Sequence, residues 1–178
     1  MSRFFFFYKT AFFFFISSLI GCTEEPIATA KIDQSLKQQI ALKILAKTNV
    51  IRSENGLSPL TQNDDMDELA ELHSQNMITF SFFDHVDHED KSPSDRADDL
   101  RFSWSSIAEN IGYVPWAENV IGCRDTRMAD LISSCVVDGW EKSPGHFANI
   151  IGNYKELGVG VAFTQDSIAY FTQVFRTP

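Results

Sequence analysis

The 178-residue chain is acidic, with 24 Asp and Glu against 15 Lys and Arg and a formal net charge of −9. A surface of this sign repels phosphate backbones and anionic lipid headgroups, which argues against a nucleic-acid-binding protein. About 145 residues remain once the N-terminal segments described next are set aside, and this is one domain with room for a hydrophobic core.

Residues 1–21 have the organisation of a secretory signal peptide. Two basic residues, Arg3 and Lys9, precede an apolar run that is too short to span a bilayer, because a span takes about 20 apolar residues. Residues 19–22 are similar to the bacterial lipobox. We therefore expect cleavage before Cys22 and lipidation of that cysteine. The alternative is an ordinary signal peptide followed by an incidental cysteine.

Residues 22–34 are predicted to be a tether, because they combine Pro26 and scattered charges with no sustained apolar period. Loss of the signal segment removes two basic residues and takes the formal net charge from −9 to −11. The domain that follows, residues 35–178, is expected outside the cytoplasm and held to a membrane through lipid alone. In a host with two membranes, Thr23 after Cys22 resembles the outer-membrane sorting pattern.

Two helices are predicted in the first half of the domain. The first begins at Ser35, which forms a capping box with Gln38, and ends before Gly56. The second begins near Asn63 and has one apolar face. Because His73 lies on that face, we interpret it as a satisfied core residue, with a metal ligand as the alternative. The face consists of Met66, Leu69, Ala70, His73, Met77 and Phe80.

The second half changes from helical to strand periodicity. A short helix is predicted to start at Ser92-Pro93, and a long one runs from Met128 and stops at Ser143. Residues 157–163 alternate in character, and a turn leads to residues 168–175, which predicts a C-terminal antiparallel hairpin. Helices followed by strands favour an α+β layered domain.

Cys123 and Cys135 are the only cysteines besides Cys22. In an oxidising compartment two such residues usually pair, and a loop of this length predicts a disulfide that contributes about 3 kcal/mol. The alternative is that Cys135, which lies on a helical apolar stripe, is a buried thiol.

Common enzyme signatures are missing from the sequence, including G-x-S-x-G, H-E-x-x-H, the P-loop and C-x-x-C. What remains is a scattered set of histidines and carboxylates beside aromatic or β-branched neighbours. Spacing alone does not assemble them into a site.

The order of the motifs nevertheless resembles the CAP superfamily, in its short bacterial SCP-like branch, over about residues 38–176. The resemblance implies a three-layer α-β-α sandwich with a central antiparallel sheet and a cleft. The matching segments are Asn49…Arg52…Gly56-Leu57-Ser58-Pro59-Leu60, His73-Ser74…Met77, Phe83-Asp84-His85, Trp104-Ser105…Glu109-Asn110-Ile111, Trp140…Ser143-Pro144-Gly145-His146…Asn149-Ile150 and Glu156-Leu157-Gly158-Val159-Gly160-Val161.

In that family, two histidines and two glutamates line the cleft and can hold a divalent cation. The resemblance maps the histidines to His85 and His146 and the first glutamate to Glu109. The fourth position departs from the pattern, since this chain has Ser143 there. A set of two histidines and one glutamate suits zinc with an open water position, whereas a lost carboxylate weakens calcium or magnesium.

Three further features have open roles. His88 forms a local pair with His85 that is interpreted as a solvated loop histidine rather than a metal ligand. Glu156 matches a glutamate of the bacterial branch and is expected to orient a loop or a cleft residue. Residues 113–137 form a longer segment than the bacterial pattern has at this place, and we therefore expect an insertion near the cleft. The insertion is expected to be closed by the Cys123–Cys135 bond and to determine which partner binds.

The favoured function is a binding module for a lipid, a cell-envelope component or a protein. The alternative is a metal-dependent hydrolase in which His85 or His146 acts as base or zinc ligand and Glu109 as ligand or proton acceptor. No convincing nucleophile is present, because Ser143 before Pro-Gly is typical of a helix cap or turn. A third interpretation is that the cleft residues form only a hydrogen-bonded network.

Overall fold

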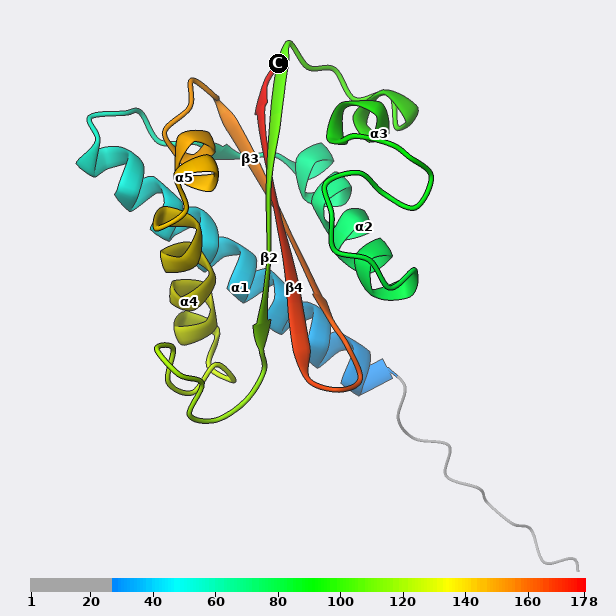
Figure 1. Ribbon diagram of the computed structural model, residues 1–178, viewed down its shortest axis with the longest axis vertical. Coiled ribbons are helices and arrows are strands. Elements are labelled where there is room, and N and C mark those ends of the chain that lie inside the picture. Colours follow the sequence, from blue (N-terminus) through cyan, green and yellow to red (C-terminus); the bar gives the residue numbers. More distant parts are fainter. Residues whose placement is uncertain (1–26) are drawn as a thin grey trace, which may run out of the picture.

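The computed structural model describes residues 27–178, which form five helices and one four-stranded sheet. Figure 1 shows the sheet between two helical layers, with α1, α4 and α5 on one side and α2 and α3 on the other. The expected three-layer sandwich is therefore confirmed. The signal segment, Cys22 and the start of the tether lie outside the described residues.

Three long antiparallel strands make up most of the sheet, in the order β1-β3-β4-β2. The C-terminal hairpin is confirmed as β3–β4. The short β1 adds a parallel pair to β3, so the sheet is mixed rather than wholly antiparallel. The strands are β1 (Thr61–Gln62), β2 (Ser106–Pro115), β3 (Glu156–Phe163) and β4 (Ile168–Thr177).

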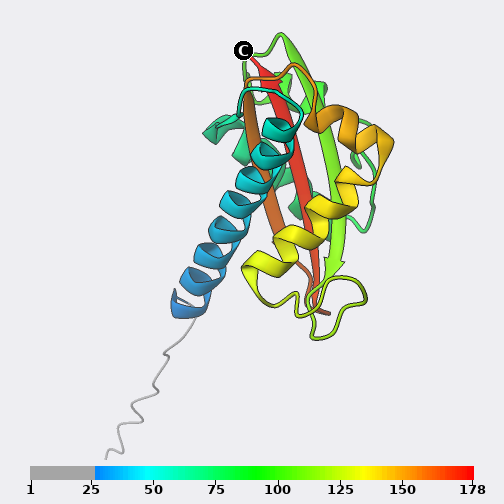
Figure 2. The same cartoon turned by 90° about the vertical axis from the view of Figure 1, so that its left-hand side faces the viewer.

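The helices cover the sheet because each presents an apolar face to it. Figure 2 shows α1 and α4 crossing the same face, where they share one core with β3 and β4. A smaller core lies under α2 on the opposite face. The helices are α1 (Ile27–Glu54), α2 (Asp64–Thr79), α3 (Pro93–Asp99), α4 (Ala129–Glu141) and α5 (Pro144–Ile150).

The predicted start of the first helix is wrong. Helix α1 begins at Ile27, so the last part of the predicted tether is helical and Ser35 is an interior residue whose Oγ accepts a bond from the Gln39 amide. A Ser and Gln three residues apart have the spacing of a capping box, but the same spacing also occurs inside a helix, where the backbone N–H groups are already bonded.

The predicted starts of α2 and α3 are confirmed by their caps. Asn63 Oδ1 accepts the Met66 N–H at 3.1 Å, and Ser92 and Asp95 form a reciprocal capping box with Pro93 in the first turn. Since these caps fix where each helix begins, they also fix where the side chains of α2 and α3 meet the sheet.

Two glycines of β3 bring the backbone of α2 directly onto the sheet. A Cβ at Gly158 would lie 2.0 Å from the Met66 carbonyl carbon, and one at Gly160 would lie 2.2 Å from that of Ala70. Only hydrogen fits at these two positions. The close approach places the next turns of α2, including His73, against the strands.

Candidate functional site

Glu109 is a buried carboxylate on β2, the edge strand of the sheet, and its side chain is 1% exposed. It faces the layer of α2 and α3, where it meets His85, Arg96 and His73. The Arg96 Nη2 donates to Glu109 Oε2 at 2.6 Å, and His85 Nδ1 lies 2.9 Å from Oε1. These four residues are called the Glu109 cluster below.

Arg96 comes from α3 and joins three segments through its guanidinium. While Nη2 binds Glu109, Nη1 donates to the carbonyl oxygens of His85 at 2.8 Å and Lys91 at 2.9 Å. The loop that carries His85 is therefore held to α3 and β2 by one side chain. Arg96 was missed in the sequence because an arginine in a short, charged helix has the pattern of a surface residue; only the contacts identify it.

His73 is fully buried, which confirms that it is a core residue, but its ring is not fully satisfied as predicted, since only one of its two nitrogens is hydrogen-bonded within residues 27–178. Burial lowers the pKa of His73, and its Nε2 donates to the Asp84 carbonyl at 3.0 Å. The same Nε2 lies 3.6 Å from Glu109 Oε1. Its Nδ1 is buried and has no hydrogen-bond partner within residues 27–178, and the same holds for the Nε of Arg96.

His85 lies at the surface of the cluster, with its side chain 45% exposed. Its hydrogen bond with Glu109 raises the pKa of His85 above the ordinary value. His146, on α5, has a pKa lowered first by burial and then by the nearby His85. Within the described part of the chain, no hydrogen bond or ion pair joins the His146 ring to Glu109, so His85 and Glu109 are in contact and His146 is only a neighbour.

Helix α5 is fixed to β2 by amide side chains. Asn110 Nδ2 donates to the His146 carbonyl at 3.1 Å, and Asn149 Nδ2 donates to the Glu109 carbonyl at 3.1 Å. Because neighbouring strand residues point to opposite faces, Glu109 meets α3 while Asn110 meets α5. The edge strand thus has His85 on one side and His146 on the other.

The two secondary candidates, Ser143 and Glu156, have no described hydrogen bond or ion pair with this cluster. Ser143 occupies the N-cap position of α5 without a side-chain cap bond, and no described hydrogen bond joins its hydroxyl to His146. Glu156 forms an ion pair at 2.6 Å with Arg176, whose Nη1 donates to the Ser103 carbonyl. Glu156 therefore holds a loop at the end of the sheet.

His88 stacks on Phe80 with ring centroids 3.4 Å apart. It is exposed on the loop after α2, in agreement with its interpretation as a solvated histidine.

The Glu109 cluster does not fit a divalent metal in this arrangement. Within residues 27–178, no group of three or more His, Cys, Asp or Glu side chains is placed to hold an ion. One oxygen of Glu109 accepts from Arg96 and the other contacts His85, while Ser143 supplies no carboxylate. The chemistry of the donor set is that of a buried ion pair.

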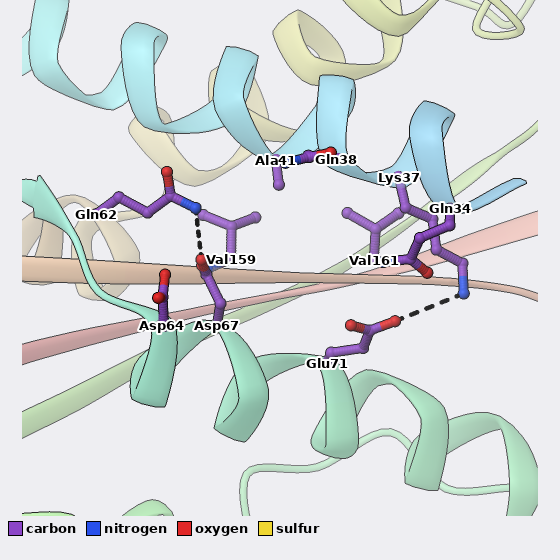
Figure 3. Close-up of a pocket in the computed structure, with 10 residues that line it drawn as sticks. All are labelled: Gln34, Lys37, Gln38, Ala41, Gln62, Asp64, Asp67, Glu71, Val159 and Val161. Atoms are coloured by element: carbon purple, nitrogen blue, oxygen red, sulfur yellow. Dashed lines mark hydrogen bonds and ion pairs between the residues drawn. The ribbon is translucent and has the colours of Figure 1, made fainter. Parts of the chain in front are cut away.

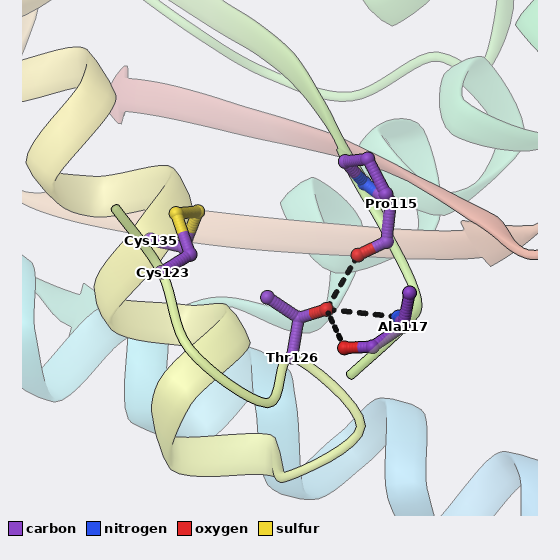
Figure 4. Close-up of a disulfide and its surroundings, with 5 residues drawn as sticks. All are labelled: Pro115, Ala117, Cys123, Thr126 and Cys135. Atoms are coloured by element: carbon purple, nitrogen blue, oxygen red, sulfur yellow. Dashed lines mark hydrogen bonds between the residues drawn. A yellow bond between two sulfur atoms is a disulfide. The ribbon is translucent and has the colours of Figure 1, made fainter. Parts of the chain in front are cut away.

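The disulfide between Cys123 and Cys135 is confirmed, with a Cα–Cα distance of 5.2 Å. It joins α4 to the loop that follows β2, and Figure 4 shows Thr126 closing the base of that loop through bonds to Pro115 and Ala117.

The segment 113–137, predicted to be an insertion, includes parts of two regular elements. Its first residues belong to β2 and its last to α4, which leaves a loop over 116–128. Trp116, whose N–H donates to Ser167, is seven residues beyond Glu109, or about 23 Å along a strand. The start of the loop is therefore separated from Glu109 by the second half of β2, and the placement of the loop near the cleft stays a prediction.

Removal of the disulfide should destabilise this loop and the start of α4. We expect the Cys123→Ser, Cys135→Ser double variant to lose about 3 kcal/mol of unfolding free energy, from the loop-closure entropy of the unfolded chain. Denaturant unfolding with and without reductant measures this. The wild type should move to the variant's midpoint when reduced, and an unchanged midpoint would contradict the prediction.

A cavity of about 270 Å³ lies at the opposite edge of the sheet, between α1, α2 and β3 (Figure 3). Lys37 and Glu71 pair across it at 3.7 Å, and Asp67 accepts the Val159 N–H at 2.7 Å. Burial raises the pKa of Asp67. None of the predicted site residues lines this cavity, so it is separate from the Glu109 cluster.

Comparison with known proteins agrees with this fold. The family model described as CAP, the cysteine-rich secretory protein family, matches residues 45–175. Two Bacillus subtilis proteins are similar over 134 residues, or 75% of the chain. These are the uncharacterized membrane protein YlbC, 31% identical, and the uncharacterized protein YkwD, 28% identical. The match spans 33% and 45% of their lengths.

Solved structures show the same fold at lower identity. An extracellular SCP-domain protein from Bacillus anthracis has a TM-score of 0.65 and 24% identity, covering 87% of this chain and 45% of that one. An outer surface protein from Borrelia burgdorferi has a TM-score of 0.60 and 17% identity, covering 86% and 96%. Within residues 27–178, no helix is long and apolar enough to cross a membrane.

Proposed function

Since the chain belongs to the CAP family of cysteine-rich secretory proteins, we propose that it is an extracytoplasmic binding module held to its membrane by lipid on Cys22. Similarity to an extracellular protein and to an outer surface protein supports this location. The contact surface of the proposed module is a group of exposed aromatic rings beside the Glu109 cluster.

This aromatic patch consists of the exposed Phe83 and Tyr113 and of Tyr170, which is half-buried. The ring centroids of Phe83 and Tyr113 are 5.0 Å apart, and those of Phe83 and Tyr170 are 6.0 Å apart. Phe83 is 45% exposed and Tyr113 is 56% exposed, although aromatic rings of this size are normally more buried. Exposed aromatic groups of this kind are enriched at protein interfaces, and this patch is the observation that carries the proposal.

The Glu109 cluster gives the patch a rigid support. Phe83 precedes His85 by two residues, and that loop is held by Arg96 and by the bond from His73 to the Asp84 carbonyl. Tyr113 lies on the same face of β2 as Glu109. A surface fixed before binding loses less conformational entropy when a partner docks.

An envelope protein is the partner that the surface favours. The cavity of about 270 Å³ and the hollow of about 160 Å³ beside Arg96 are both smaller than the roughly 300–1,000 Å³ typical of pockets that enclose a small molecule. The acidic net charge disfavours an anionic lipid surface. An exposed aromatic patch instead suits docking of another protein.

The hydrolase alternative has less support. The hydroxyl of Ser143 has no described bond to a histidine that would activate it, and the carboxylate of Glu109 is engaged by Arg96. We therefore treat the cluster as a support for binding rather than as catalytic machinery.

Photo-cross-linking in intact cells tests this proposal. A photo-reactive aromatic residue is placed at position 113 of the full chain, and the matched control carries it at Val50, which is equally exposed at 56% but lies on α1. We expect a discrete protein adduct from position 113 only, with the yield lowered about tenfold or more by Phe83→Ala, as for loss of a hot-spot residue.

The adduct protein, once purified, should bind the full chain and bind the Phe83→Ala variant more weakly. Equal adducts from positions 113 and 50, or no adduct at all, would refute the proposed surface. Adducts to glycan or lipid alone would refute a protein partner.

A further inference from the structure

The geometry points to Arg96 as the resident cation of the Glu109 site: we propose that its guanidinium stands where a divalent metal would otherwise bind, so that this domain works without a metal in the cluster. This inference rests on the contacts of Glu109 and is independent of the aromatic patch.

Both carboxylate oxygens of Glu109 are already engaged. Oε2 accepts from Arg96 at 2.6 Å, and Oε1 is 2.9 Å from His85. The Glu109 side chain is 1% exposed and that of Arg96 is 7% exposed, so water screens the pair weakly. A metal would have to displace a short, charge-assisted bond to reach the carboxylate.

The positive charge of the Arg96 guanidinium is permanent. An arginine stays protonated in proteins, and Arg96 is held in position by the carbonyls of His85 and Lys91. A divalent ion placed against Glu109 would lie beside this charge and be repelled by it. A zinc site has the opposite requirement, a set of anionic or neutral donors around an open position.

His73 and His146 are the histidines that, with His85, would complete a metal site at Glu109. His73 uses Nε2, its nitrogen nearer Glu109, to donate to the Asp84 carbonyl, and this leaves Nδ1 without a partner within the described residues. His146 makes no described contact with Glu109. Because His73 Nε2 and both oxygens of Glu109 are already engaged, these residues do not form a metal ligand set.

Zinc titration of the full chain, purified in detergent, tests the inference. We expect no zinc binding that depends on His85, measured by metal content after desalting and by thermal shift. His85 is the residue to vary because it is half exposed and its loss should leave the protein folded. His88→Ala is the matched control, since it removes a surface histidine from the same loop.

Variants of Arg96 provide the complementary result. Arg96→Met removes the charge and frees an oxygen of Glu109, so zinc affinity should rise at least about tenfold, equivalent to about 1.4 kcal/mol. Arg96→Lys keeps a cation and should bind zinc no better than the wild type.

One zinc per wild-type chain, lost in His85→Ala and kept in His88→Ala, would overturn the inference. Equal zinc affinity in folded Arg96→Met and Arg96→Lys would also overturn it. If Arg96→Met does not fold, the comparison of wild type with His85→Ala decides the matter. Neither result bears on cross-linking through position 113.

Discussion

Replacing Glu109 by alanine should lower the free energy of unfolding by about 3–5 kcal/mol, because it leaves the buried guanidinium of Arg96 without its counter-charge. Arg96 is 7% exposed and its ion pair with Glu109 measures 2.6 Å. The loss of the bond to His85 adds to the effect. Denaturant unfolding of the full chain, with a linear extrapolation to water, measures it.

The double variant Glu109→Leu, Arg96→Met is the control for this prediction. It removes both charges and leaves no uncompensated buried charge, although the His85 and Lys91 carbonyls lose the donor that Arg96 provides, so it should be more stable than Glu109→Ala despite carrying two changes. If Glu109→Ala lowers the free energy of unfolding by less than about 1 kcal/mol, the Glu109–Arg96 pair contributes no more than an exposed surface salt bridge does. That result would contradict the burial of the pair.

The second large effect is expected at Gly160. Gly160→Ala should destabilise the domain by about 3 kcal/mol or more, because the new Cβ would lie 2.2 Å from the Ala70 carbonyl carbon and force α2 off the sheet. The new Cβ and the Ala70 carbonyl carbon are both fixed to the backbone, so neither can move aside as the end of a flexible side chain would. Thermal and denaturant unfolding measure the loss.

Gly139→Ala is the matched control for Gly160→Ala. Gly139 lies on the exposed side of α4, and a Cβ there meets nothing within 4 Å. The same substitution should raise stability by about 0.5–1 kcal/mol, since alanine favours a helix more than glycine does. A similar change at both glycines would contradict the close approach of α2 and β3.

Periodicity predicted those elements whose pattern is set by one buried face. Helices α2 and α4 and the β3–β4 hairpin are of this kind. Strand β2 was missed because Glu109 and Asn110, two polar residues, are both buried in its middle and interrupt the alternation that predicts a strand. The two polar residues that hide the strand pattern of β2, Glu109 and Asn110, are also the residues that hydrogen-bond to α3 and α5.

Local sequence patterns were insufficient where other parts of the chain determine the structure or the role of a residue. Ser35 has the spacing of a cap, yet α1 continues through it. Arg96 carries no motif, and its role follows from contacts with His85, Lys91 and Glu109, which lie up to 13 residues away. The resemblance of single motifs predicted that His85 and Glu109 belong together, but it could not predict the arginine between α3 and β2.

A crystal structure of the full chain, purified in detergent and grown with zinc, would show through the anomalous signal of the metal whether a zinc ion binds at Glu109. We expect the Arg96 guanidinium within hydrogen-bond distance of Glu109 and no anomalous peak at that carboxylate. A zinc ion bound by Glu109 and His85, with Arg96 turned away, would contradict it.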